Sequence, residues 1–188
     1  MKLHCLVEDL DTARAAIDGG ATVIQLRRKD LDTVELVEFG RPFVRLCREA
    51  GIPLVVNDDV NAALALNANG VHLGRTDEGK ELAKAARLML GISATSIYEA
   101  IAAEEQGATY IGAGPVWPTP SKADAGAPIG LDGLAAICEA VKAPVVAIGG
   151  VDASNARACI DAGAKGVAVV RASKDARAVR AAIDADTF

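Results

Sequence analysis

The sequence predicts an α/β protein, a (β/α)₈ barrel folded as one compact domain over residues 1–188. Eight short apolar runs alternate with Ala- and Leu-rich stretches that have helical spacing. Short apolar strands that are each followed by a helix are typical of a parallel sheet buried on both faces. A junction also recurs in AIDGGATVIQL, ALNANGVHLG, AEEQGATYIGA and CIDAGAKGVAVV, where a helix ends at small residues or glycine and a strand begins.

The competing architecture is an open, doubly wound sheet. Eight strand–helix units, and the absence of Gly-x-Gly-x-x-Gly after the first strand, favour the closed barrel. A chain of 188 residues with 51% apolar composition is long enough for one large core, and no linker marks a second domain.

The expected strands are short, are rich in Val, Ile and Leu, and several open on Gly or Pro. They are residues 3–7, 23–26, 53–56, 70–73, 91–94, 110–112, 144–148 and 166–170. A helix is expected after each strand. The helices are residues 11–18, 33–49, 60–67, 78–90, 97–106, 131–141, 154–161 and 174–184.

Composition and charge exclude several classes of function. The net charge of −5 argues against binding a nucleic-acid backbone, and 3% aromatic residues argues against base-stacking platforms. The four cysteines are scattered, and His4 and His72 are not at metal-ligand spacing from them, so we expect neither disulfides nor a structural zinc site. With no secretory h-region and no apolar run of membrane-spanning length, we expect a cytoplasmic protein with no membrane partner.

In such a barrel the active site lies where the strands end, on the loops that follow. The second strand ends in Gln25, Arg27 and Lys29, which brings two cations to this face, although such a run is also typical of a solvated surface. The third is followed by Asn57, Asp58 and Asp59, a cluster that also suits a helix N-cap.

The fourth strand leads to Asp77 at a helix start. Asp58 and Asp77 on neighbouring loops would offer hard oxygen ligands to one cation, with phosphate oxygens completing the set, which suits Mg²⁺. His72 lies within an apolar run and is expected in the core or behind the site.

The later strands end in small hydroxyls and glycines. Ser93 follows the fifth strand, although such hydroxyls commonly cap helices; after the sixth, a proline-rich loop of unusual length carries Thr119, Ser121 and Lys122. Gly150 after the seventh strand, and Val170 with Arg171 at the end of the eighth, occupy the usual phosphate-binding place of such barrels. Together these residues favour metal-assisted chemistry on phosphates over hydride transfer or Ser/His/Asp hydrolysis.

Six motifs resemble the thiamine-phosphate synthase family in order and spacing, over nearly the whole chain from Leu3 to about Ala172. They are Gln25-Leu-Arg27-Arg-Lys29, Asn57-Asp58, Gly70-Val-His-Leu-Gly-Arg-Thr-Asp77, Gly91-Ile-Ser93, Gly114-Pro-Val-Trp-Pro-Thr119-Pro-Ser121-Lys122 and Ala147-Ile-Gly-Gly-Val151. The resemblance implies Mg²⁺-dependent coupling of hydroxymethylpyrimidine diphosphate with thiazole phosphate, giving thiamine phosphate and pyrophosphate.

The resemblance also implies roles for individual residues. The residues that bind the diphosphate would be Arg27, Lys29, Asn57 and Lys122. Asp58 and Asp77 would hold Mg²⁺, and Gln25 would orient the pyrimidine. The thiazole-phosphate side would be formed by Ser93, Thr119, Ser121, Gly150, Val170 and Arg171. The substrates are thus small phosphorylated molecules, and a homodimer is compatible with this family.

Some positions depart from the family pattern. Arg75 replaces a usual Gln, Asn69 a usual Asp, Thr95 a usual His and Arg171 a usual Ser. The alternatives are therefore a TenI-like thiazole tautomerase, which would use a histidine after the fifth strand, and a non-catalytic phosphate-binding barrel with a regulatory role. A Schiff-base aldolase is disfavoured because no expected strand contains a lysine.

Overall fold

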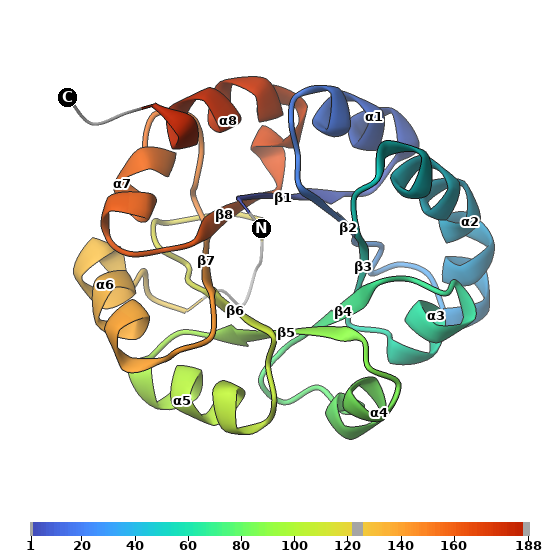
Figure 1. Cartoon of the computed structure of the whole chain (residues 1–188), viewed down its shortest axis with the longest axis horizontal. Coiled ribbons are helices and arrows are strands. Elements are labelled where there is room, and N and C mark those ends of the chain that lie inside the picture. The colour runs from blue at the N-terminus through green and yellow to red at the C-terminus, as the bar shows by residue number, and fades with distance from the viewer. Residues whose placement is uncertain (1, 122–125, 186–188) are drawn as a thin grey trace.

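Eight parallel strands close into a barrel in the order β1 to β8, and the helices surround it (Figure 1). The coordinates are a computed structural model that describes residues 2–121 and 126–185. Each strand pairs with its neighbours in sequence, and β1 pairs with β8 to complete the circle. The predicted barrel is confirmed.

The strands have four to six residues. They are β1 Leu3–Val7, β2 Val23–Leu26, β3 Leu54–Asn57, β4 Gly70–Leu73, β5 Met89–Ala94, β6 Tyr110–Ala113, β7 Val145–Ile148 and β8 Gly166–Val169. The helices are α1 Leu10–Asp18, α2 Thr33–Ala50, α3 Val60–Ala65, α4 Lys80–Ala85, α5 Ile97–Glu105, α6 Gly130–Ala140, α7 Ala156–Asp161 and α8 Ala176–Asp184.

The fifth strand begins earlier than expected, and the helix before it is shorter. We expected a helix over residues 78–90, but α4 ends at Ala85 and β5 starts at Met89. Arg87 adopts a left-handed backbone (φ 57°), and the N–H groups of Arg87 and Leu88 donate to carbonyls of the last helical turn. This helix stop needs no glycine, and the apolar residues after it therefore belong to the strand.

The last helix is also preceded by an element that the sequence pattern did not predict. Residues Arg171–Asp175 form a 3₁₀ turn between β8 and α8. The buried Ser173 hydroxyl makes hydrogen bonds to the carbonyl oxygens of Leu6 and Val169, which ties this turn to the ends of β1 and β8.

The barrel interior is unusually polar around Tyr110. His72 pairs in register with Gly91, and Gly91 pairs with Tyr110, so all three point to the same side of the sheet. A Cβ atom at Gly91 would lie 2.2 Å from Tyr110 Cζ and 2.4 Å from His72 Nδ1. Glycine is therefore required at this position, because the Tyr110 ring and the His72 imidazole fill the space above it.

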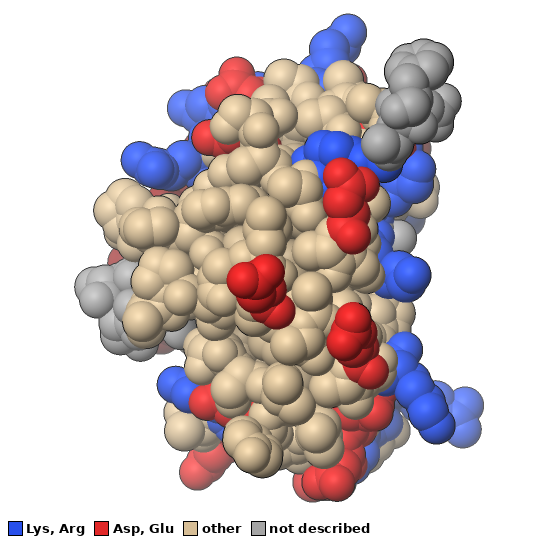
Figure 2. Space-filling model, turned by 90° about the vertical axis from the view of Figure 1, so that its left-hand side faces the viewer, with Lys and Arg blue, Asp and Glu red and all other residues tan. Residues whose placement is uncertain are grey.

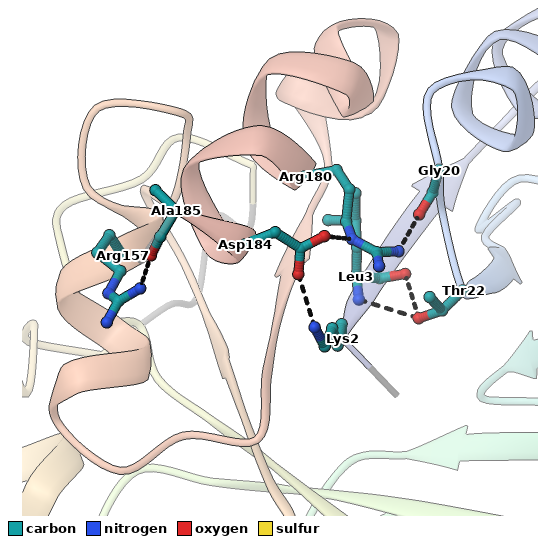
Figure 3. A network of polar contacts seen from close by, with 8 residues as sticks. All are labelled: Lys2, Leu3, Gly20, Thr22, Arg157, Arg180, Asp184 and Ala185. Atoms are coloured by element: carbon teal, nitrogen blue, oxygen red, sulfur yellow. Dashed lines mark hydrogen bonds and ion pairs between the residues drawn. The ribbon is translucent and has the colours of Figure 1, made fainter. Parts of the chain in front are cut away.

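The two ends of the described chain are joined by a polar network (Figure 3). The Asp184 carboxylate accepts from Lys2 Nζ at 2.6 Å and from Arg180 Nε at 2.5 Å, and Arg180 also donates to the Gly20 carbonyl. Arg157 on α7 donates to the carbonyl of Ala185. These contacts hold α8 against the loop before β2 and against the start of β1.

Seen from the side of α6 and α7, the surface is largely uncharged, with isolated acidic side chains and cationic groups towards its borders (Figure 2). Within residues 2–121 and 126–185, no helix combines the length and apolar character needed to cross a membrane.

Candidate functional site

A cavity of about 510 Å³ opens where β2, β3 and β4 end. Three loops line it, and they bring together Lys29, Asn57, Asp58, Asp59, Glu78 and Gly79, among other residues. It lies at the face where a barrel of this kind carries its active site, and its walls hold both a cation and carboxylates.

The two aspartates after β3 have different surroundings. Asp59 is the N-cap of α3: its carboxylate accepts the Ala62 N–H at 2.8 Å and the Thr33 hydroxyl at 2.6 Å. Asp58 has a left-handed backbone (φ 64°), and its N–H donates to the His72 carbonyl at 2.8 Å. The capping interpretation of this cluster therefore applies to Asp59, and the side chain of Asp58 is left to face the cavity.

Asp58 and Asp77 lie close enough for their charges to interact, as the spacing of the two loops predicted. Burial, and then the negative charge of Asp77, raise the pKa of Asp58 above its usual value. Lys29 Nζ lies 3.7 Å from Asp58 Oδ2 and partly opposes this effect. Two carboxylates and one ammonium form an arrangement whose excess negative charge suits a cation.

The loop that carries Asp77 is fixed by its own hydrogen bonds. One Asp77 oxygen accepts the Gly74 N–H at 2.6 Å, and Lys80 Nζ donates to the carbonyls of Arg75 and Asp77 at 2.9 and 2.6 Å. A Cβ atom at Gly74 would lie 2.9 Å from Asp77 Oδ2, so the carboxylate packs directly against this glycine.

The cations after β2 point in different directions. Arg28 forms a two-pronged pair with Asp30 and lies 4.4 Å over the Phe39 ring, so its charge is already paired. Arg27 is largely buried and lies 3.6 Å from Glu8, whereas Lys29 reaches Asp58. Arg28 and Lys29 both line the cavity, but the Arg28 guanidinium is held by Asp30 and Phe39, whereas Lys29 lies beside Asp58.

A buried polar chain forms the floor of the barrel mouth. Tyr110 Oη lies 3.0 Å from His72 Nδ1, and His72 Nε2 lies 3.0 Å from Ser93 Oγ. The side chain of Gln25, only 3% exposed, lies near the Tyr110 hydroxyl and partly offsets the effect of burial on the pKa of that group. Burial raises the pKa of Tyr110, so its hydroxyl remains protonated. Gln25 and Ser93, predicted on opposite halves of the site, are therefore linked through two side chains.

His4 lies beneath this chain, with its ring edge-on to Tyr110 at 5.1 Å. Burial, and then the nearby His72, lower the pKa of His4 to about 3, so its imidazole is neutral. Among buried side-chain polar atoms of the described residues, its Nε2 is the one without a hydrogen-bond partner.

The proline-rich loop after β6 lies against the glycines after β7. The N–H groups of Val116 and Trp117 donate to the carbonyls of Ile148 and Gly149 at 2.9 and 3.0 Å. A Cβ atom at Gly150 would lie 2.7 Å from Trp117 Cβ, so glycine permits this close approach.

The remaining predicted residues are placed as follows. Thr119 and Ser121 are half-buried, and the Ser121 N–H donates to the Thr119 hydroxyl at 3.2 Å. Val170 packs against the apolar cluster inside the barrel, whereas the Arg171 side chain is exposed on the 3₁₀ turn. Lys122 lies outside the described residues.

Comparison with known proteins decides the family. A family model described as thiamine monophosphate synthase matches residues 3–173. The chain belongs to the thiamine monophosphate synthase family. It is an enzyme, a transferase of the thiamine-phosphate synthase type.

Individual relatives agree with this assignment. A thiamine-phosphate synthase of Moorella thermoacetica is 48% identical over 176 residues, covering 92% of this chain and 84% of the relative. Another from Pyrococcus furiosus is 45% identical, covering 98% and 92%. The solved thiamine phosphate pyrophosphorylase of Pyrococcus furiosus superposes with a TM-score of 0.88 at 40% identity, over 97% of this chain and 95% of that one.

The donor set fits a hard divalent cation. Among the described residues, no three His, Cys, Asp or Glu side chains gather as a complete metal site. The protein would supply the Asp58 and Asp77 oxygens, and phosphate or water oxygens would supply the remainder, as is usual for Mg²⁺. The raised pKa of Asp58 is consistent with a site whose charge is balanced only when a cation is bound.

The sequence pattern missed three contributors to the site of this family member. In the sequence, Tyr110 resembles an ordinary residue of an apolar strand, Lys80 resembles a surface cation, and Glu99 resembles a residue of a polar helix face. Alternation along β6 could have placed Tyr110 inside the barrel, but no sequence signal showed which groups its hydroxyl would meet.

Proposed function

We propose that this enzyme catalyses Mg²⁺-dependent coupling of hydroxymethylpyrimidine diphosphate with thiazole phosphate, releasing thiamine phosphate and pyrophosphate. The observation that carries the proposal is that Asp58 and Lys29 line the cavity of a chain of this family, with Asp77 near enough to raise the pKa of Asp58. Paired carboxylates beside an ammonium suit a metal-bound diphosphate better than an uncharged substrate.

The diphosphate end of the substrate would lie over the ends of β2 and β3. Arg27, Lys29 and Asn57 would bind its oxygens, and Lys122 belongs to this group on the sequence pattern alone. Mg²⁺ held by Asp58 and Asp77 would neutralise negative charge on the diphosphate. The chain's own cations would hold the diphosphate in place as the bond from the methylene carbon to oxygen breaks and that oxygen keeps the electron pair.

The other end of the site would hold the two rings. The side chain of Gln25, which lies near Tyr110, would orient the pyrimidine. Ser93 would face the thiazole phosphate together with Thr119, Ser121, Gly150, Val170 and Arg171. The lone pair of the thiazole nitrogen forms the new bond to the methylene carbon, so the step needs no general base. The proline-rich loop would exclude water from the electron-poor carbon.

The tautomerase alternative is less well supported. Its base would stand near Thr95, but the N–H and hydroxyl of Thr95 both donate to Glu99, at 2.6 and 2.7 Å. The nearby imidazole of His72 is hydrogen-bonded at both nitrogens.

Mass spectrometry of the reaction products tests the proposed function. The enzyme is given both substrates with Mg²⁺, and each substrate is omitted in turn. We expect thiamine phosphate only when both are present. Conversion of an isomeric thiazole phosphate without any pyrimidine would instead establish tautomerase activity.

A further inference from the structure

Glu99 connects two loops of the site. It is the third residue of α5, where a carboxylate ordinarily turns back to the N–H of the capping residue. The capping residue is Ser96, but Glu99 Oε2 accepts the N–H and hydroxyl of Thr95, at 2.6 and 2.7 Å. Glu99 Oε1 forms an ion pair with Arg75, on the loop after β4.

The two partners of Glu99 stand next to proposed binding groups. Thr95 is two residues after Ser93, whose hydroxyl contacts His72. Arg75 is two residues before Asp77 and lies in the loop whose carbonyls bind Lys80. One carboxylate therefore joins the turn carrying Ser93 to the loop carrying Asp77.

The link is partly protected from water. The Glu99 side chain is 27% exposed and that of Arg75 is 54% exposed. Burial alone would raise the pKa of Glu99, but the hydrogen bonds from Thr95 and the pair with Arg75 lower it overall, so the carboxylate stays charged. A charged acceptor with three donors has little freedom to rotate.

We propose that Glu99 is a positioning residue, which through Arg75 holds the loop after β4 so that Asp77 faces Asp58 when a metal–diphosphate binds. This inference rests on the proposed function and extends it to residues that touch neither substrate nor metal. Arg75 and Thr95, from two different loops, meet at this one carboxylate.

Glu99→Gln tests the proposal with little change in shape. The amide oxygen of the new side chain can still accept from Thr95, while its NH₂ group can no longer pair with Arg75. Arg75→Gln breaks the same link from the other side. Glu104→Gln is the matched control, since Glu104 lies on the same helix and accepts the N–H groups of Lys142 and Ala143, both at 2.7 Å.

Isothermal calorimetry of inorganic pyrophosphate binding, with Mg²⁺ and with EDTA, gives a readout that does not depend on turnover. We expect Glu99→Gln and Arg75→Gln each to weaken Mg²⁺-dependent binding about two- to five-fold, the range of a partly exposed ion pair. The double variant should bind pyrophosphate no more weakly than the more affected single variant. In EDTA, both variants should bind pyrophosphate as the unmodified enzyme does. Glu104→Gln should bind as the unmodified enzyme does under both conditions.

Unchanged Mg²⁺-dependent affinity in Glu99→Gln would overturn the positioning role, and so would an equal loss in Glu104→Gln. Additive losses in the double variant would also overturn it, because the two residues would then act separately. If the unmodified enzyme bound pyrophosphate equally well in EDTA, the metal assignment itself would fail, and the positioning role would fail with it.

Discussion

The negative charge of Asp77 raises the pKa of Asp58, although the two residues follow different strands of the barrel. Lys29 Nζ, 3.7 Å from Asp58, balances only part of their charge. In the absence of a cation, burial and the charge of Asp77 therefore make the ionised form of Asp58 less favourable than it is in water.

Asp58→Asn should therefore stabilise the metal-free enzyme while weakening its Mg²⁺-dependent binding of pyrophosphate. Asn tolerates the left-handed backbone at this position, so the loop should be retained. In EDTA at neutral pH we expect a gain of up to about 1 kcal/mol, the upper range for partly exposed charges.

The pH dependence of stability tests the expected gain from Asp58→Asn. A carboxyl group with a raised pKa contributes stability that is present at low pH and is lost as pH rises through the folded-state pKa. The gain from Asp58→Asn should thus shrink as pH falls through the raised pKa of Asp58, and it should be absent below the usual Asp pKa. Denaturant unfolding in EDTA measures it, and a gain independent of pH would contradict the repulsion between Asp58 and Asp77.

Lys29→Ala should weaken pyrophosphate binding roughly ten-fold, as expected for the loss of one charge-assisted contact. Arg28→Ala is the neighbouring comparison: Arg28 also lines the cavity, but its guanidinium is held by Asp30 and lies over Phe39 rather than beside Asp58. We expect Arg28→Ala to change affinity less than about two-fold, as for a surface ion pair. Equal losses in the two variants would indicate only a general effect of positive charge on this loop.

Gly91→Ala should destabilise the barrel by about 2–3 kcal/mol or more, because the new methyl group would overlap Tyr110 and His72. Gly126→Ala is the matched control, since a Cβ atom there would meet no atom of the part of the chain that the structure describes within 4 Å. Thermal and denaturant unfolding compare the two. A Gly91→Ala enzyme as stable as the control would show that the interior has more room than the structure indicates.

Asp184→Asn should lower the melting temperature at neutral pH by about 1–2 °C, since Asp184 accepts from both Lys2 and Arg180. These hydrogen bonds lower the pKa of Asp184, so its contribution is present above the usual Asp pKa and is lost as pH falls through the lowered value. The two proteins should converge in acid. A difference that persisted there would point to packing rather than charge.

The alternation of strand and helix could be predicted because apolar residues recur with a different spacing in strands and in helices. The placement of Asp58 near Asp77 could be predicted because neighbouring parallel strands end on the same face of the barrel. The predicted end of the helix at residue 90 was wrong, because α4 stops at Ala85 and Arg87 adopts a left-handed conformation that is usually found at glycine. Local sequence does not determine such a stop, since the tertiary contacts of β5 decide it.

The polar interior could not be predicted because it depends on which strands face each other across the barrel. Tyr110, His72 and Gln25 lie on three strands, and the stagger of the closed sheet brings them together. The bridge formed by Glu99 was missed for the same reason, since a helix residue at capping distance from Ser96 gave no sign that it reaches Arg75.

Release of pyrophosphate by the purified enzyme tests the central claim most directly. The enzyme is supplied with hydroxymethylpyrimidine diphosphate and thiazole phosphate, together and singly, with Mg²⁺ or with EDTA. We predict sustained release only when both substrates and Mg²⁺ are present. Release that continues at the same rate in EDTA, or no release although the enzyme binds pyrophosphate, would contradict metal-dependent coupling at Asp58 and Asp77.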